Sequence, residues 1–115
     1  MASILIIDND PQIITMYCEI LSATGHEVDF ADNGLLGLKL FNSRACDLVI
    51  TEIFMPEVDG FEVILNLKMK LPCPKIIVTG AVGDLCNGKL LKMVKDFGAD
   101  RTLSKNLSVN KMYFL

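Results

Sequence analysis

The stretch DLVITEIFMP, residues 47–56, decides the fold, because it is a short apolar run that ends on one acidic residue, Glu52. Leu48, Val49 and Ile50 form a continuous apolar run rather than an alternating one, as expected of a central strand that is covered on both faces. Such strands belong to parallel sheets flanked by helices. The stretch therefore predicts an α/β fold with a carboxylate at the end of a central strand.

Apolar runs of strand length alternate with amphipathic helical stretches along the rest of the chain. We expect strands at residues 3–8, 27–31, 47–51, 75–79 and 101–104. We expect helices at residues 11–24, 33–43, 60–70 and 84–98, and a short last one at 108–115. This order predicts a doubly wound parallel sheet of five strands with helices on both faces, in a single domain of residues 1–115.

The first helix has the clearest boundaries. Asp10 is suited to cap its N-terminus, and Pro11 is suited to the first helical position. Gly25 is suited to the left-handed conformation that follows a helix C-terminus.

Composition excludes several classes of function. The net charge is −3 with a pI near 5.0, and the basic residues are spread along the chain, so we expect no direct nucleic-acid partner. No apolar run approaches the roughly 20 residues that span a bilayer, so we expect a cytoplasmic protein with no membrane partner. The four cysteines form no CxxC pair and the chain has one histidine, which argues against a zinc site or a disulfide framework.

Polar side chains follow the expected strands at their carboxyl ends, where ligands gather in doubly wound sheets. Asp8 and Asn9 follow the first strand, and Glu52 follows the third. Thr79 ends the fourth strand and Lys105 follows the fifth. Carboxylates at adjacent strand ends can hold a divalent cation, while a hydroxyl and an ammonium can bind phosphoryl oxygens. The pattern predicts a site for acyl-phosphate chemistry.

Four motifs in these positions resemble the receiver domain of two-component response regulators, the CheY-like family, over essentially the whole chain. They are ILIIDNDP (4–11), DLVITEIFMPEVDGFE (47–62), IIVTGA (76–81) and GADRTLSKN (98–106). The resemblance implies a flavodoxin-like sheet with strand order 2-1-3-4-5. In that family an aspartate at the end of the third strand accepts a phosphoryl group from a histidine kinase in the presence of Mg²⁺.

The resemblance also implies a role for each matching residue. Asp8 and Asn9 fall on the acidic pair that binds metal, and Glu52 falls on the phosphoacceptor, which is also a metal ligand. The backbone carbonyl of Phe54 falls on the remaining metal position. The two residues that respond to the phosphoryl group fall on Thr79 and Lys105.

Several positions depart from the family pattern. Glu52 carries one methylene more than aspartate, and Asn9 removes one charge from the cation site, so we expect a weakened Mg²⁺ site and no other cofactor. Thr102 stands where the family usually has an aromatic residue, and Asn106 stands where it has a proline. Because a cis bond before a residue other than proline costs about 3–4 kcal/mol, we expect a trans bond there.

These departures favour a degenerate receiver, or pseudo-receiver, that has no enzymatic activity and acts through protein–protein interaction. Its expected partners are a sensor histidine kinase or a downstream signalling protein, and homodimerisation stays open. One alternative is a slow but working phosphoacceptor. Another is a small phosphohydrolase of the haloacid dehalogenase type, although Gln12 stands where that chemistry needs threonine or valine.

Overall fold

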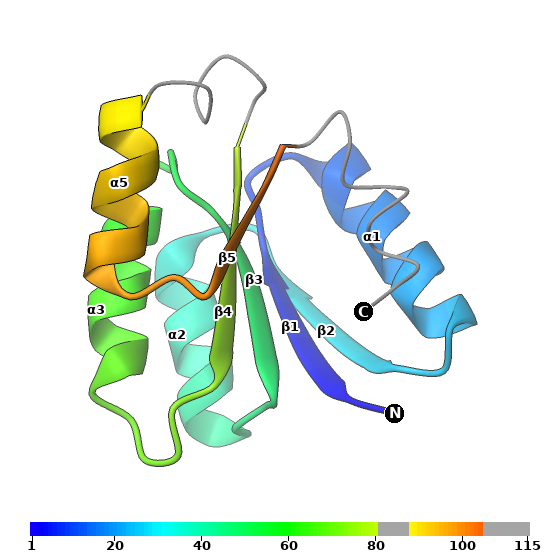
Figure 1. Cartoon of the computed structure of the whole chain (residues 1–115). Helices are drawn as coiled ribbons and strands as arrows, with labels where there is room; N and C mark the ends of the chain where they lie inside the picture. The colour runs from blue at the N-terminus through cyan, green and yellow to red at the C-terminus, as the bar shows by residue number, and fades with distance from the viewer. Residues whose placement is uncertain (81–87, 105–115) are drawn as a thin grey trace.

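The computed structural model describes residues 1–80 and 88–104, which form a parallel sheet covered by helices on both faces (Figure 1). The strand order is β2-β1-β3-β4-β5, as the family resemblance implied. The strands are β1 (Ser3–Ile7), β2 (Glu27–Ala31), β3 (Leu48–Glu52), β4 (Lys75–Gly80) and β5 (Arg101–Ser104). All neighbouring strands are parallel, so their carboxyl ends lie at one edge of the sheet.

The helices are α1 (Pro11–Ala23), α2 (Gly34–Ser43), α3 (Gly60–Lys68) and α5 (Gly88–Phe97). The first three begin after a side chain that accepts a hydrogen bond from a backbone amide of the first turn: Asp10, Asn33 and Asp59. The expected cap at Asp10 and the expected first helical residue Pro11 are confirmed. Gly25 adopts a φ of 91°, which confirms the left-handed residue expected after α1.

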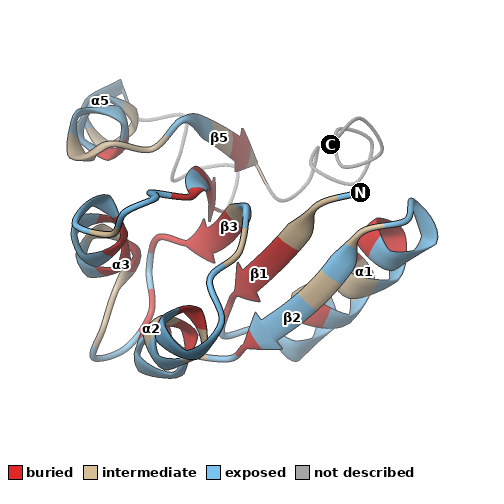
Figure 2. Cartoon of the chain, turned by 90° about the horizontal axis from the view of Figure 1, so that it is seen from below, coloured by how far each residue is buried: buried red, intermediate tan, exposed pale blue. Residues whose placement is uncertain are grey.

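Each face of the sheet packs against its own helices and forms its own apolar core. Helices α2, α3 and α5 pack on one face around a core that includes Val49, Val63 and Val94. Helix α1 packs on the other face, where Tyr17 and Leu21 are fully buried against the strands. Figure 2 shows that β1 and β3 are buried, whereas β2 at the sheet edge is largely exposed.

Strand β3 begins and ends one residue later than its expected range. Asp47, expected as its first residue, uses its carboxylate to accept a hydrogen bond of 2.8 Å from the amide of Ser3. At the other end Glu52 pairs in register with Thr79 and so belongs to the strand itself. Strand β1 ends at Ile7, one residue before the expected boundary.

Four described helix boundaries also differ from the expected ranges. Helix α1 ends at Ala23 rather than residue 24, and α5 ends at Phe97 rather than residue 98. Asn33, expected as the first residue of its helix, is the N-cap of α2. Helix α3 ends at Lys68 rather than residue 70, because the amides of Met69 and Lys70 donate to carbonyls only three residues back. The start of the helix expected at 84–98 and the short helix expected at 108–115 lie outside the described residues.

Candidate functional site

Three of the expected site residues meet at the carboxyl ends of the central strands. Asp8 follows β1, Glu52 ends β3 and Thr79 lies in β4. Ile7 pairs with Thr51, so the next residues, Asp8 and Glu52, lie at matching positions at the ends of neighbouring strands. On the other side of β3, Glu52 pairs directly with Thr79. The sequence therefore predicted correctly that these side chains share one edge of the sheet.

These polar residues are almost fully buried. The exposed fraction is 1% for Asp8, 5% for Glu52 and 1% for Thr79. Burying a carboxylate costs free energy unless hydrogen bonds or opposite charges compensate, so apolar packing cannot account for such a cluster. Acids buried at this position therefore indicate a site rather than ordinary strand ends that meet water.

Hydrogen bonds to the local backbone hold both the main chain and the carboxylate of Asp8 in place. Its amide donates to the carbonyl of Ala31, which ties it to the end of β2. Its Oδ1 accepts a hydrogen bond of 2.9 Å from the amide of Asp10. Asp10 itself is exposed, and its Oδ1 accepts from the amide of Gln12, so Asp10 caps α1 as expected.

Two hydroxyls at this end of the sheet have unused hydrogen-bonding capacity, and one of them lies beside the acids. The Thr79 Oγ1 is buried and has no hydrogen-bond partner among the described residues. The same holds for the Oγ of Ser104, which pairs with Gly80 at the end of β5. Buried hydroxyls are nearly always hydrogen-bonded, so these two can receive a polar ligand or water.

Ser104 was not predicted from the sequence as a residue of this end of the sheet. It lies one residue before Lys105, and its position as the last residue of an expected strand was the available signal. Lys105 lies outside the described residues.

The metal ligands expected from the resemblance are only partly brought together. Asp8 and Glu52 are buried at the ends of neighbouring strands, whereas Asn9 is exposed. The expectation for Phe54 concerns its backbone carbonyl and stays a prediction. No group of three or more His, Cys, Asp or Glu suited to a metal ion occurs in the described part of the chain. Carboxylate oxygens suit Mg²⁺, and this ion is often held by one or two carboxylates with water and phosphate. The residues fit Mg²⁺ through Asp8 and Glu52 as a reduced set of ligands.

The end of β3 and the start of α3 are in close backbone contact. The Ile53 amide donates to the carbonyl of Thr79 at 3.2 Å, and the Gly60 amide donates to the carbonyl of Ile53 at 2.8 Å. A Cβ atom at Gly60 would lie 2.4 Å from the carbonyl oxygen of Glu52. The backbone of Glu52 is thus positioned by a helix as well as by its sheet.

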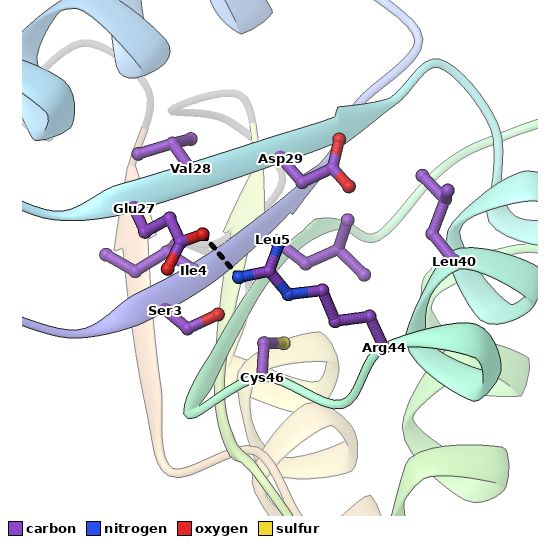
Figure 3. Close-up of a pocket in the computed structure, with 9 residues that line it drawn as sticks. All are labelled: Ser3, Ile4, Leu5, Glu27, Val28, Asp29, Leu40, Arg44 and Cys46. Carbon is purple, nitrogen blue, oxygen red and sulfur yellow. Dashed lines mark hydrogen bonds and ion pairs between the residues drawn. The ribbon is translucent and has the colours of Figure 1, made fainter.

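A separate cavity of about 100 Å³ lies at the opposite, amino-terminal end of the strands (Figure 3). Glu27 and Arg44 form an ion pair at its mouth, and Cys46 lines its wall. Burial is the main cause that raises the pKa of the Cys46 thiol to about 11. His26 also lies at this end, where its Nδ1 accepts from the amide of Ala2. None of these groups contributes to the acidic site.

Comparisons with known proteins agree with the arrangement of the sheet and helices. The chain matches the response regulator receiver domain model over residues 4–113, and it belongs to that family. The structure resembles that of Vibrio cholerae chemotaxis protein CheY4 with a TM-score of 0.87 at 24% identity, covering 97% of this chain and 92% of the other. It also resembles a receiver domain protein from Clostridium thermocellum, with a TM-score of 0.76 at 29% identity and coverages of 99% and 95%.

Curated relatives include both short and long proteins. Chemotaxis protein CheY of Listeria monocytogenes is 33% identical over 111 residues, which cover 90% of this chain and 93% of CheY. Transcriptional regulatory protein AfsQ1 of Streptomyces coelicolor is 34% identical over 85 residues, which cover 74% of this chain and 38% of AfsQ1. The match to GlrR of Escherichia coli covers only 19% of that regulator. The chain thus spans a minor part of these two regulators.

No helix in residues 1–80 and 88–104 is long and apolar enough to cross a membrane.

Proposed function

We propose that this chain is a degenerate receiver in which Glu52 occupies the phosphoacceptor position and signals by binding other proteins without being phosphorylated. The observation that carries this proposal is the place of Glu52, buried at the carboxyl end of β3 and paired in register with Thr79. Family membership favours a receiver over the phosphohydrolase alternative.

The length of Glu52 is the physical reason for expecting poor phosphotransfer. One extra methylene moves the reacting carboxylate by about 1–1.5 Å relative to aspartate, and an error of about 1 Å can cost about 100-fold in a positioned reaction. Glu52 would instead supply a permanent charge of about −1. A phosphoryl group carries about −1.5 to −2, so a glutamate imitates the phosphorylated state only in part.

The proposal includes a weak Mg²⁺ site held by Asp8 and Glu52, with the backbone carbonyl of Phe54 and the side chain of Asn9 as further ligands. Mg²⁺ would neutralise negative charge on the oxygens around it. Asn9 in place of an acid removes one attraction; a pair of unit charges at about 4 Å is worth about 4 kcal/mol near a protein surface. The same proposal assigns no enzymatic turnover, a cytoplasmic location, and a sensor histidine kinase or a downstream signalling protein as the partner.

The slow phosphoacceptor stays as a second candidate because of the Thr79 hydroxyl. That hydroxyl is buried beside Glu52 without a hydrogen-bond partner among the described residues, so it is available to a phosphoryl oxygen. In this alternative Thr79 and Lys105 would bind the phosphoryl group after its transfer to Glu52.

Acetyl phosphate with Mg²⁺, followed by intact-mass measurement, separates the two candidates. We expect the parent protein to gain no stoichiometric phosphoryl group, and the double variant Glu52→Asp, Asn9→Asp to gain one. Glu52→Gln in the parent and Asp8→Asn in the double variant are the matched controls. Stoichiometric labelling of the parent that disappears in Glu52→Gln would establish the slow phosphoacceptor and end the proposal of a degenerate receiver.

A further inference from the structure

Among residues 1–80 and 88–104, the loop between α3 and β4, residues 69–74, carries the most exposed large apolar side chains after Met1. Leu71 is 97% exposed and Met69 is 82% exposed, whereas the other exposed large apolar side chains after Met1 reach at most 54%. Figure 1 shows this loop, in yellow-green, projecting beyond the ends of α3 and β4. It lies at the end of the molecule opposite the acidic site.

Positive charge surrounds these two side chains. Residues 68–75, KMKLPCPK, contain three lysines and no acid. Lys68 and Lys75 are exposed, and Lys70 is partly exposed. The stretch therefore carries a local charge of +3 in a chain whose net charge is −3.

Neighbouring elements add further positive charge at the same end. The Lys68 side chain lies against Gly98, just after α5, since a Cβ at Gly98 would fall 2.3 Å from the Lys68 Cε. Lys95 lies in the last turn of α5, and Arg101 begins β5.

The acids near this end are already engaged. Asp47 accepts from the amide of Ser3, and Asp100 accepts from the amide of Ile76 at 2.8 Å. Asp96 pairs with Lys92 at 2.8 Å on the surface of α5. These three acids reduce the positive potential at this end of the molecule, but none of them lies within the loop of residues 69–74.

We propose that the loop docks on an anionic lipid surface, with Met69 and Leu71 entering the boundary of the acyl chains and Lys68, Lys70 and Lys75 contacting the head groups. Projecting apolar side chains bordered by lysines have the two properties that surface binding requires, which are apolar area to bury and charge complementary to anionic lipids. Pro72 and Pro74 restrict the backbone of the loop and so reduce the conformational entropy lost on docking. The expectation of no membrane partner depended only on the lack of a spanning segment, and docking on a lipid surface does not require such a segment.

Vesicle co-sedimentation tests this proposal with two lipid compositions. One vesicle is pure phosphatidylcholine and the other has a quarter of its lipid replaced by phosphatidylglycerol. We expect binding to the anionic vesicle alone, and its loss at about 1 M NaCl, where the Debye length is about 3 Å. The variant Lys70→Gln should weaken binding about fivefold. Lys39→Gln, which removes an exposed lysine of α2, should leave binding unchanged.

A second pair of variants separates insertion from simple charge attraction. Met69→Ser with Leu71→Ser should reduce binding at least about tenfold, because the apolar anchors are lost. Leu65→Ser with Met93→Ser removes the same two residue types from exposed positions on α3 and α5 and should leave binding unchanged. Equal loss in both double variants would contradict docking through the loop.

Tryptophan fluorescence reports where the loop lies, because the chain has no tryptophan of its own. Leu71→Trp should shift its emission to the blue on anionic vesicles, and Leu65→Trp should not. Absence of binding, or binding without this shift, would overturn the proposal. Self-association that Met69→Ser with Leu71→Ser abolishes, in the absence of vesicle binding, would assign the loop to a second copy of the chain and would also overturn it.

Discussion

Substitution of Gly60 by alanine tests how tightly α3 is packed on the end of β3. The added Cβ would lie 2.4 Å from the carbonyl oxygen of Glu52 and 2.7 Å from the Cα of Ile53. Both neighbours are backbone atoms, so they cannot move aside by changing a side-chain rotamer. Relief to an ordinary contact distance requires a shift of about 1 Å in β3 or α3, and overpacking of this kind costs about 1–3 kcal/mol.

The better helix propensity of alanine offsets up to about 1 kcal/mol of that cost. We therefore expect Gly60→Ala to lower the free energy of unfolding by about 1–2 kcal/mol, and the Tm by about 4 °C for each kcal/mol. Urea unfolding followed by circular dichroism measures the change. Hydrogen exchange at the Ile53 amide, which donates to Thr79, should also become faster in the variant.

Gly88 provides a matched control because it is the first residue of α5, as Gly60 is of α3. A Cβ at Gly88 would meet no heavy atom of the described residues within 4 Å. We expect Gly88→Ala to leave stability unchanged or to raise it by up to about 1 kcal/mol. If Gly60→Ala were as stable as the parent, with unchanged exchange at Ile53, close packing would not position the end of β3.

Replacing Asp10 by alanine should lower the free energy of unfolding by about 1 kcal/mol, because the hydrogen bond to the Gln12 amide is lost, while Asp10→Ser should retain most of it. Equal urea midpoints for the two variants would contradict the assignment of this cap. At pH 8 a disulfide reagent should modify the exposed Cys73 before Cys46, since burial raises the pKa of Cys46 to about 11 and leaves about one thiolate in a thousand. The reaction of Cys46 should accelerate as the pH rises toward that value. In a Cys86→Ser background, the further variant Cys73→Ser should lose the fast phase; a fast phase that survived would contradict the expectation.

The sequence predicted the sheet and its acidic edge because both depend on local patterns. Continuous apolar runs marked the central strands, and polar residues placed directly after them had to meet at one edge of a parallel sheet. Asp8, Glu52 and Thr79 followed from this reasoning. The strand order came from the family resemblance, since hydrophobic pattern alone does not choose which strands become neighbours.

Other features depend on contacts between distant residues and could not be read from the pattern. Asp47 looked like a strand residue, but its carboxylate binds the amide of Ser3 on a neighbouring strand. Ser104 is a common polar residue whose burial follows from its pairing with Gly80 across the sheet. The contact between Gly60 and Glu52 depends on where α3 packs on the sheet, so the sequence pattern could not predict it.

The exposed edges of the sheet limit the ways in which two copies of the chain can associate. Edge strand β2 presents Glu27 and Asp29 to solvent, and the opposite edge strand β5 has four residues in the described part of the chain and begins with Arg101. Charged side chains on an edge and short edge strands both disfavour continuation of a sheet into a neighbouring molecule. Growth into open-ended fibrils through backbone pairing at these two strands is therefore disfavoured.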